Sequence, residues 1–158
     1  EALRVAIEDG ERAGLPGIDL EEARRVLAEE ERRAKALAGL RQAVANQDRD
    51  GLRSAIEEGK RAGLKAKDLA SAEAVLEEEE RKCAARSDLK DAVASRDISR
   101  LRSSIQGGEA AGLKDIDLAD ARKTLAEEEK KAAAKRQIQD AMSSSNTDAL
   151  RKAIRVGE

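Results

Sequence analysis

The sequence predicts an all-α protein made of tandem copies of a short helix followed by a long helix. Three observations lead to this prediction: a segment that returns every 49 residues without insertion or deletion, a composition rich in strong helix formers, and a single proline among 158 residues. Charged residues make up 41% of the chain, but 31 basic side chains nearly balance 33 acidic ones. Near-neutral charge and helix-forming composition favour ordered helices over a disordered chain.

The repeat is clearest around its leucines. The segments LRVAIEDGERAGL, LRSAIEEGKRAGL, LRSSIQGGEAAGL and LRKAIRVGE begin at Leu3, Leu52, Leu101 and Leu150. We therefore divide the chain, a single repeat array over 1–158, into repeats 3–51, 52–100 and 101–149 with a partial fourth repeat at 150–158. The only methionine is internal, and we expect the chain to be a piece of a longer protein.

Each short helix has recognisable ends. Asp48 is placed to cap the helix of the second repeat, and Asp97 and Asn146 take the same place later, because a short acidic or amide side chain can accept the first free backbone N–H groups. Gly63 before Leu64 predicts a left-handed stop. Between these ends, apolar or small residues follow the i, i+3, i+4, i+7 spacing of one helix face, namely Leu52, Ala55, Ile56 and Gly59.

One glycine recurs inside every short helix, at Gly10, Gly59, Gly108 and Gly157. Glycine in a helix interior costs about 1 kcal/mol relative to alanine. Its fourfold recurrence predicts a neighbouring helix that approaches across the missing side chain, with a ligand contact as the alternative.

The long helix is expected to start after Asp19, Asp68 or Asp117 as the capping residue, with Glu22 completing a capping box in the first copy. From Leu20 no strong helix breaker follows until Gln47, which predicts a helix of about 27 residues.

The long helix carries two apolar segments separated by the polar stretch 77–82, EEEERK. If its first half packs on the preceding short helix and its second half on the following one, the repeats form an elongated array of small three-helix bundles. The alternative is a side-by-side α-solenoid.

The bundle arrangement resembles the spectrin repeat, in which one helix continues from bundle to bundle, although the period here is shorter and spectrin's tryptophan is missing. The cadence AGL…DL…A…L…EEE, which covers the whole chain, is similar to repeats in very large proteins of dinoflagellate algae. That resemblance implies no assigned activity.

The segment NQDRDGLRSAIEEG resembles a calcium-binding EF-hand loop. Oxygen-bearing side chains fall at positions 1, 3, 5, 9 and 12 of such a loop, with glycine at position 6. They belong to Asn46, Asp48, Asp50, Ser54 and Glu57. In the next copy Arg100 replaces the glycine and Gln106 the final glutamate, so a structural helix start is the favoured interpretation and a weak calcium site the alternative.

Other chemical sites are not expected. The chain has no histidine, no residue pairing that would activate a nucleophile and no phosphate-binding glycine loop, so we predict no enzyme, no catalytic residues and no cofactor. The side chains of three consecutive glutamates in a helix point in different directions and do not converge on one centre. The repeated EEE runs are therefore expected to form a solvated charged face. Cys83 and Met142 align with Ala34 and Val44 and are expected in the core.

The composition also limits the partners. A net charge of −2 and the absence of aromatic residues argue against nucleic-acid binding, and no apolar run is long enough to span a membrane. One cysteine leaves the compartment open, with an intracellular one favoured. We expect a structural spacer or scaffold whose partners are neighbouring repeats of the same longer chain, other proteins or further copies. A peptide-binding solenoid or a weakly calcium-responsive repeat are the alternatives.

Overall fold

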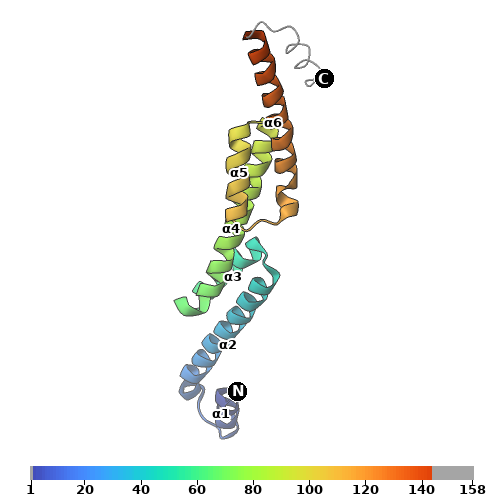
Figure 1. The fold of residues 1–158 in the computed structure, drawn as a ribbon. Helices are drawn as coiled ribbons and strands as arrows, with labels where there is room; N and C mark the ends of the chain where they lie inside the picture. The colour runs from blue at the N-terminus through green and yellow to red at the C-terminus, as the bar shows by residue number, and fades with distance from the viewer. Residues whose placement is uncertain (1, 144–158) are drawn as a thin grey trace. The chain divides into compact units, whose positions relative to one another are not determined.

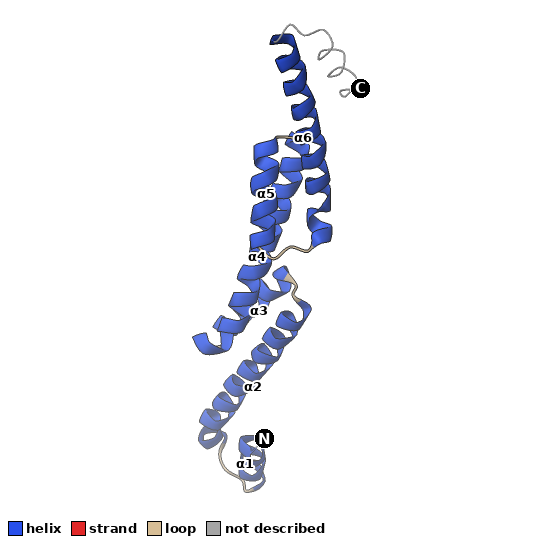
Figure 2. Cartoon of the chain, viewed as in Figure 1, coloured by secondary structure: helices blue, strands red, loops and turns tan. Residues whose placement is uncertain are grey.

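The computed structural model describes residues 2–143, and within them the chain is helical, with short connections and no strand (Figures 1 and 2). This confirms the all-α prediction. Short helices of 11–13 residues alternate with long helices of 29–30 residues. The helices are α1 (Ala2–Arg12), α2 (Gly17–Asn46), α3 (Arg49–Arg61), α4 (Ala66–Ser95), α5 (Ile98–Ala110) and α6 (Asp115–Ser143). The expected partial fourth repeat, with Asn146, Leu150 and Gly157, lies outside the described residues.

The chain divides into two compact units, residues 1–80 and residues from 81 onward. The division falls within α4, between Glu80 and Arg81. The first unit contains α1, α2, α3 and the first half of α4. The second contains the rest of α4 with α5 and α6.

The short helices start where their aspartates predict. The Asp48 side chain accepts a hydrogen bond from the Gly51 backbone N–H at 2.9 Å, and Asp97 accepts one from Arg100 at 2.8 Å. Each bond satisfies a backbone donor that has no partner within the first helical turn. The two caps are therefore confirmed.

The short helices also stop at the predicted glycines. Gly63 has φ 74°, and its equivalents Gly14 and Gly112 have φ 77° and 76°. In the second repeat the Leu64 N–H donates to the Gly59 carbonyl at 3.0 Å and the Gly63 N–H to that of Lys60 at 3.1 Å. This pair of bonds is the Schellman motif, and the same two bonds recur after α1 and after α5.

The glycine inside each short helix is explained by the leucines around it. A Cβ placed on Gly59 would lie 2.8 Å from Leu69 Cδ2 and 3.2 Å from the Cδ1 atoms of Leu40 and Leu64. These leucines come from α4, α2 and the turn after α3. The prediction of a close helix approach is therefore confirmed at Gly59, and Gly108 meets three equivalent leucines.

The predicted capping residues of the long helices are wrong by three residues, because the helices begin earlier than expected. Asp68 and Asp117 lie inside the first turns of α4 and α6, where their carboxylates accept the backbone N–H groups of Lys65 and Lys114 at 3.3 Å. They reach back from the first turn, as the second residue of a capping box does.

In the first copy the residue that precedes α2 is Pro16, which has no N–H for Asp19 to accept. The expected capping box with Glu22 is also wrong, because Glu22 lies beyond the first turn and pairs with Arg25 at 2.7 Å.

Two apolar clusters form the cores, one in each unit, and each draws residues from three helices. The first cluster combines the end of α2, α3 and the start of α4, and its buried residues are Leu40, Ala43, Leu52, Ile56, Leu69 and Ala72. The second combines the second half of α4, α5 and the start of α6, which run side by side in Figure 1. It contains all six equivalents 49 residues later, Leu89, Ala92, Leu101, Ile105, Leu118 and Ala121, together with Ala85 and Leu113.

Two predicted core positions are wrong. Cys83 is exposed on α4, since alignment with an alanine does not fix which side of the helix faces the core. Met142 is 63% exposed, whereas its equivalents Val44 and Val93 pack against the clusters. The residues equivalent in sequence to α3 and α5 that follow Met142 lie outside the described residues.

Candidate functional site

The five residues of the calcium-loop hypothesis do not lie on one loop. Asn46 is the last residue of α2 and Asp48 caps α3, but Asp50, Ser54 and Glu57 lie on α3 itself. Successive helix residues point about 100° apart, so these side chains do not turn toward one centre as the ligands of a loop do.

The acidic groups of this segment also have partners already. The Asp48 carboxylate accepts the Gly51 N–H, Asp50 lies 3.7 Å from the Arg53 guanidinium, and Glu57 pairs with Arg61 at 2.9 Å. Within residues 2–143 no group of three or more cysteines, aspartates or glutamates is arranged to hold a metal ion.

The EEE runs take part in a recurring interhelical ion pair. The last glutamate of each run accepts from the arginine that follows the first leucine of the same repeat. Arg53 bonds Glu80 and Arg102 bonds Glu129, both at 2.6 Å, and Arg4 bonds Glu31. The bond joins the start of each short helix to the middle of the following long helix.

The sequence carried a signal for this pair that composition alone does not reveal. Both partners recur with the 49-residue period and stand 27 residues apart in every copy. Only the antiparallel packing of the two helices makes that separation a contact.

Ion pairs also shift three titratable groups in the second unit. A hydrogen bond from Arg86, 3.1 Å away, lowers the pKa of the Asp117 carboxyl. Lys131 at 2.8 Å and then Arg96 at 3.0 Å lower the pKa of Glu128. Glu109 and Asp115 raise the pKa of Arg122. Each shift favours the charged form, so these groups act as fixed charges rather than as proton carriers at neutral pH.

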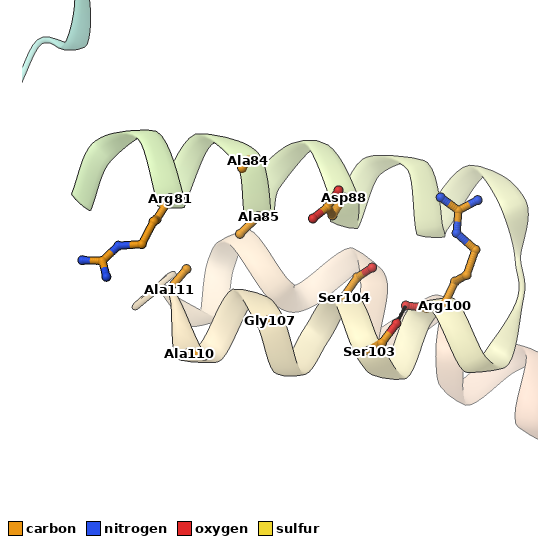
Figure 3. A pocket seen from close by; sticks show the side chains of 10 residues that line it. All are labelled: Arg81, Ala84, Ala85, Asp88, Arg100, Ser103, Ser104, Gly107, Ala110 and Ala111. Carbon is orange, nitrogen blue, oxygen red and sulfur yellow. Dashed lines mark hydrogen bonds between the residues drawn. The ribbon is translucent and has the colours of Figure 1, made fainter. Parts of the chain in front are cut away.

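A concave surface lies on the second unit, between α4 and α5 (Figure 3). It is an open groove of about 650 Å³, lined mostly by small side chains. In Figure 3 Ser103, Ser104 and Gly107 of α5 lie across from α4. The lining residues are Arg81, Ala84, Ala85, Asp88, Arg100, Ser103, Ser104, Gly107, Ala110 and Ala111.

The first unit has a smaller groove of about 250 Å³ at the corresponding place, between α2 and α3. Five of its lining residues are equivalent to residues of the larger groove: Gly39, Gly51, Ser54, Ala55 and Glu58. Of the calcium-loop residues, Asn46, Asp48 and Ser54 line it, whereas Asp50 and Glu57 do not. The groove is thus a feature of the repeat.

The groove is lined by small, hydroxyl-bearing and charged side chains. Its hydroxyl groups come from serines, and the Ser103 Oγ donates to the Arg100 carbonyl at 3.0 Å. Small residues let a partner backbone approach closely, and Arg81, Asp88 and Arg100 supply charges along the groove.

No helix in the described part of the chain has the length and apolar character needed to cross a membrane. Comparison with protein-family models, with curated proteins and with solved structures found no match.

Proposed function

We propose that this chain is a structural spacer or scaffold segment of a longer helical-repeat protein, with no catalytic activity of its own. In this proposal the repeats form an elongated array of small three-helix bundles that resemble a miniature spectrin repeat. Its immediate partners are neighbouring repeats.

One observation carries the proposal. Six core residues of the first cluster have buried equivalents 49 residues later in the second cluster. Between the two clusters, α4 gives Leu69 and Ala72 to the first and Leu89 and Ala92 to the second. Sharing each long helix between successive clusters provides a rule by which further repeats would extend the array.

The distribution of polar groups supports the same role. The buried residues among those described are apolar or glycine, and charged side chains pair with each other on the surface. In a chain organised in this way, the apolar and the charged side chains both serve to hold helices together, as expected of a spacer.

Small-angle X-ray scattering of the chain tests the proposal. Half-overlapped bundles predict a maximum dimension of roughly 80 Å, and side-by-side stacking predicts about 40–50 Å, from the helical rise and the 8–10 Å helix spacing. A dimension near the smaller value would contradict the spacer proposal and favour an α-solenoid.

The repeated groove favours a second candidate, a module that binds a helical peptide or protein. The observation behind it is the small-residue lining between α4 and α5. Selection of helical peptides from a library should then enrich binders to the natural chain, and these should lose binding to Ser103→Trp, whose ring would fill the groove. Val5→Trp, an exposed change on α1, is the matched control. Binders that ignore Ser103→Trp would contradict a groove site.

A further inference from the structure

A second interhelical ion pair recurs in all three repeats, near the turn that joins each short helix to its long helix. Glu11 pairs with Arg24 at 2.5 Å, Lys60 with Glu73 at 2.9 Å, and Glu109 with Arg122 at 2.7 Å. The partners stand 13 residues apart in each copy, and the copies are related by the 49-residue period.

The polarity of this pair alternates along the chain. In the first and third repeats the short helix carries the acid and the long helix the base, as in Glu11–Arg24. In the second repeat both charges are exchanged, so that Lys60 on α3 faces Glu73 on α4. The second repeat therefore has an ion pair at the same place as its neighbours, but both of its charges are opposite to theirs.

The pair at the other end of the same interface does not alternate. Arg4, Arg53 and Arg102 each bond the last glutamate of their own EEE run, with the same polarity in every copy. The apolar residues of the two clusters are also nearly the same from copy to copy. Neither feature can distinguish one repeat from the next.

We propose that the alternating pair is a polarity code by which each short helix selects its own long helix over that of an adjacent repeat. If α3 paired with the start of α2 or α6, Lys60 would face Arg24 or Arg122. If α1 or α5 paired with α4, Glu11 or Glu109 would face Glu73. Every exchange between adjacent repeats therefore replaces an attraction with a like-charge contact.

This selection matters because adjacent repeats compete most strongly. They are joined by a short stretch of chain, so their effective concentration for one another is high, and mispairing between similar units is a characteristic failure of repeat proteins. The paired side chains are about half exposed, so each ion pair should contribute only modestly. We expect the correct pairing of a short helix to be favoured over an exchanged pairing by roughly twofold to tenfold.

The double substitution Lys60→Glu with Glu73→Arg tests the code. It retains an ion pair in the second repeat but gives all three repeats the same polarity. After refolding from urea, we expect the share of chain outside the native monomer to rise about twofold to tenfold, measured by size-exclusion chromatography with light scattering.

Arg53→Glu with Glu80→Arg is the matched control. It reverses the invariant pair on the same two helices and leaves the alternating pair intact, so we expect no increase in misassembly. Both variants are compared at urea concentrations that give the same fraction folded at equilibrium, so that differences reflect pairing rather than stability. Equal monomer yields for the first variant and the natural chain, or equal losses in both variants, would overturn the proposal.

Discussion

Leu118 occupies the space that a side chain on Gly108 would need: a Cβ on Gly108 would lie 2.7 Å from Leu118 Cδ2. The glycine lies in the last turn of α5, two residues before its end, and its carbonyl accepts the Leu113 N–H at 3.0 Å. The position therefore joins the helix stop to the packing of the next long helix.

Gly108→Ala should destabilise the fold even though alanine is the better helix former. The added methyl group would also meet Leu89 and Leu113, each 3.3 Å from its position. Overpacking of a core costs about 1–3 kcal/mol and the gain in helix propensity offsets about 1 kcal/mol, so the net loss should be about 1 kcal/mol. Urea unfolding measures it.

Gly107→Ala is the control for this prediction, because apart from the backbone of its own helix and its chain neighbours nothing lies within 4 Å of a Cβ on Gly107. Here only the helix propensity changes, and the variant should gain about 0.5–1 kcal/mol. If both variants raised the free energy of unfolding, the leucines around Gly108 would have moved to make room for the added methyl group.

Asp97→Ala should weaken the start of α5. The carboxylate accepts the Arg100 N–H at 2.8 Å, and loss of such a cap costs about 1 kcal/mol. Asp97→Asn keeps an oxygen acceptor and should remain close to the natural chain in thermal unfolding. If both variants melt alike, the cap bond contributes nothing measurable.

Much of this fold could be predicted from local chemistry. The aspartate caps, the left-handed glycines and the periodic leucines each act within a few residues, so their signal is present in the sequence. Cys83 shows the limit of this reasoning, because alignment among repeats left open which side of α4 faces the core.

The ion pairs and the groove depend on how helices pack. The 13-residue separation of Lys60 and Glu73 becomes a contact only once the turn after α3 brings α4 back along it. The groove between α4 and α5 likewise follows from packing of small side chains that no motif marks. The ion pairs could be recognised from the sequence only as a recurring spacing, and the groove could not be recognised at all, because equivalent lining residues such as Gly39 and Asp88 differ in type.

Millimolar calcium should leave the thermal unfolding midpoint unchanged. The carboxylates of Asp48 and Glu57 already bond a backbone N–H and Arg61, and the ligands of the EF-hand hypothesis are spread along α3. Magnesium at the same ionic strength is the control for screening. A rise in midpoint with calcium alone would revive the calcium-responsive alternative.

Acid should weaken the contact between α4 and α6 through Asp117. Arg86 lowers the pKa of this carboxyl below its ordinary value of 3.8. Since the pKa is lower in the folded chain than in the unfolded one, the pair stabilises the fold above that ordinary value, and its contribution is lost as the pH falls through the folded pKa.

Arg86→Gln removes the cation, so the Asp117 pKa should rise, as followed by carboxyl NMR titration, and stability should fall less steeply with acid below about pH 4. Arg81→Gln removes the same charge from α4 without touching Asp117, and should leave that titration where it is. An unchanged Asp117 titration in Arg86→Gln would mean that the Lys114 backbone N–H, which the carboxylate also accepts at 3.3 Å, holds the pKa down instead.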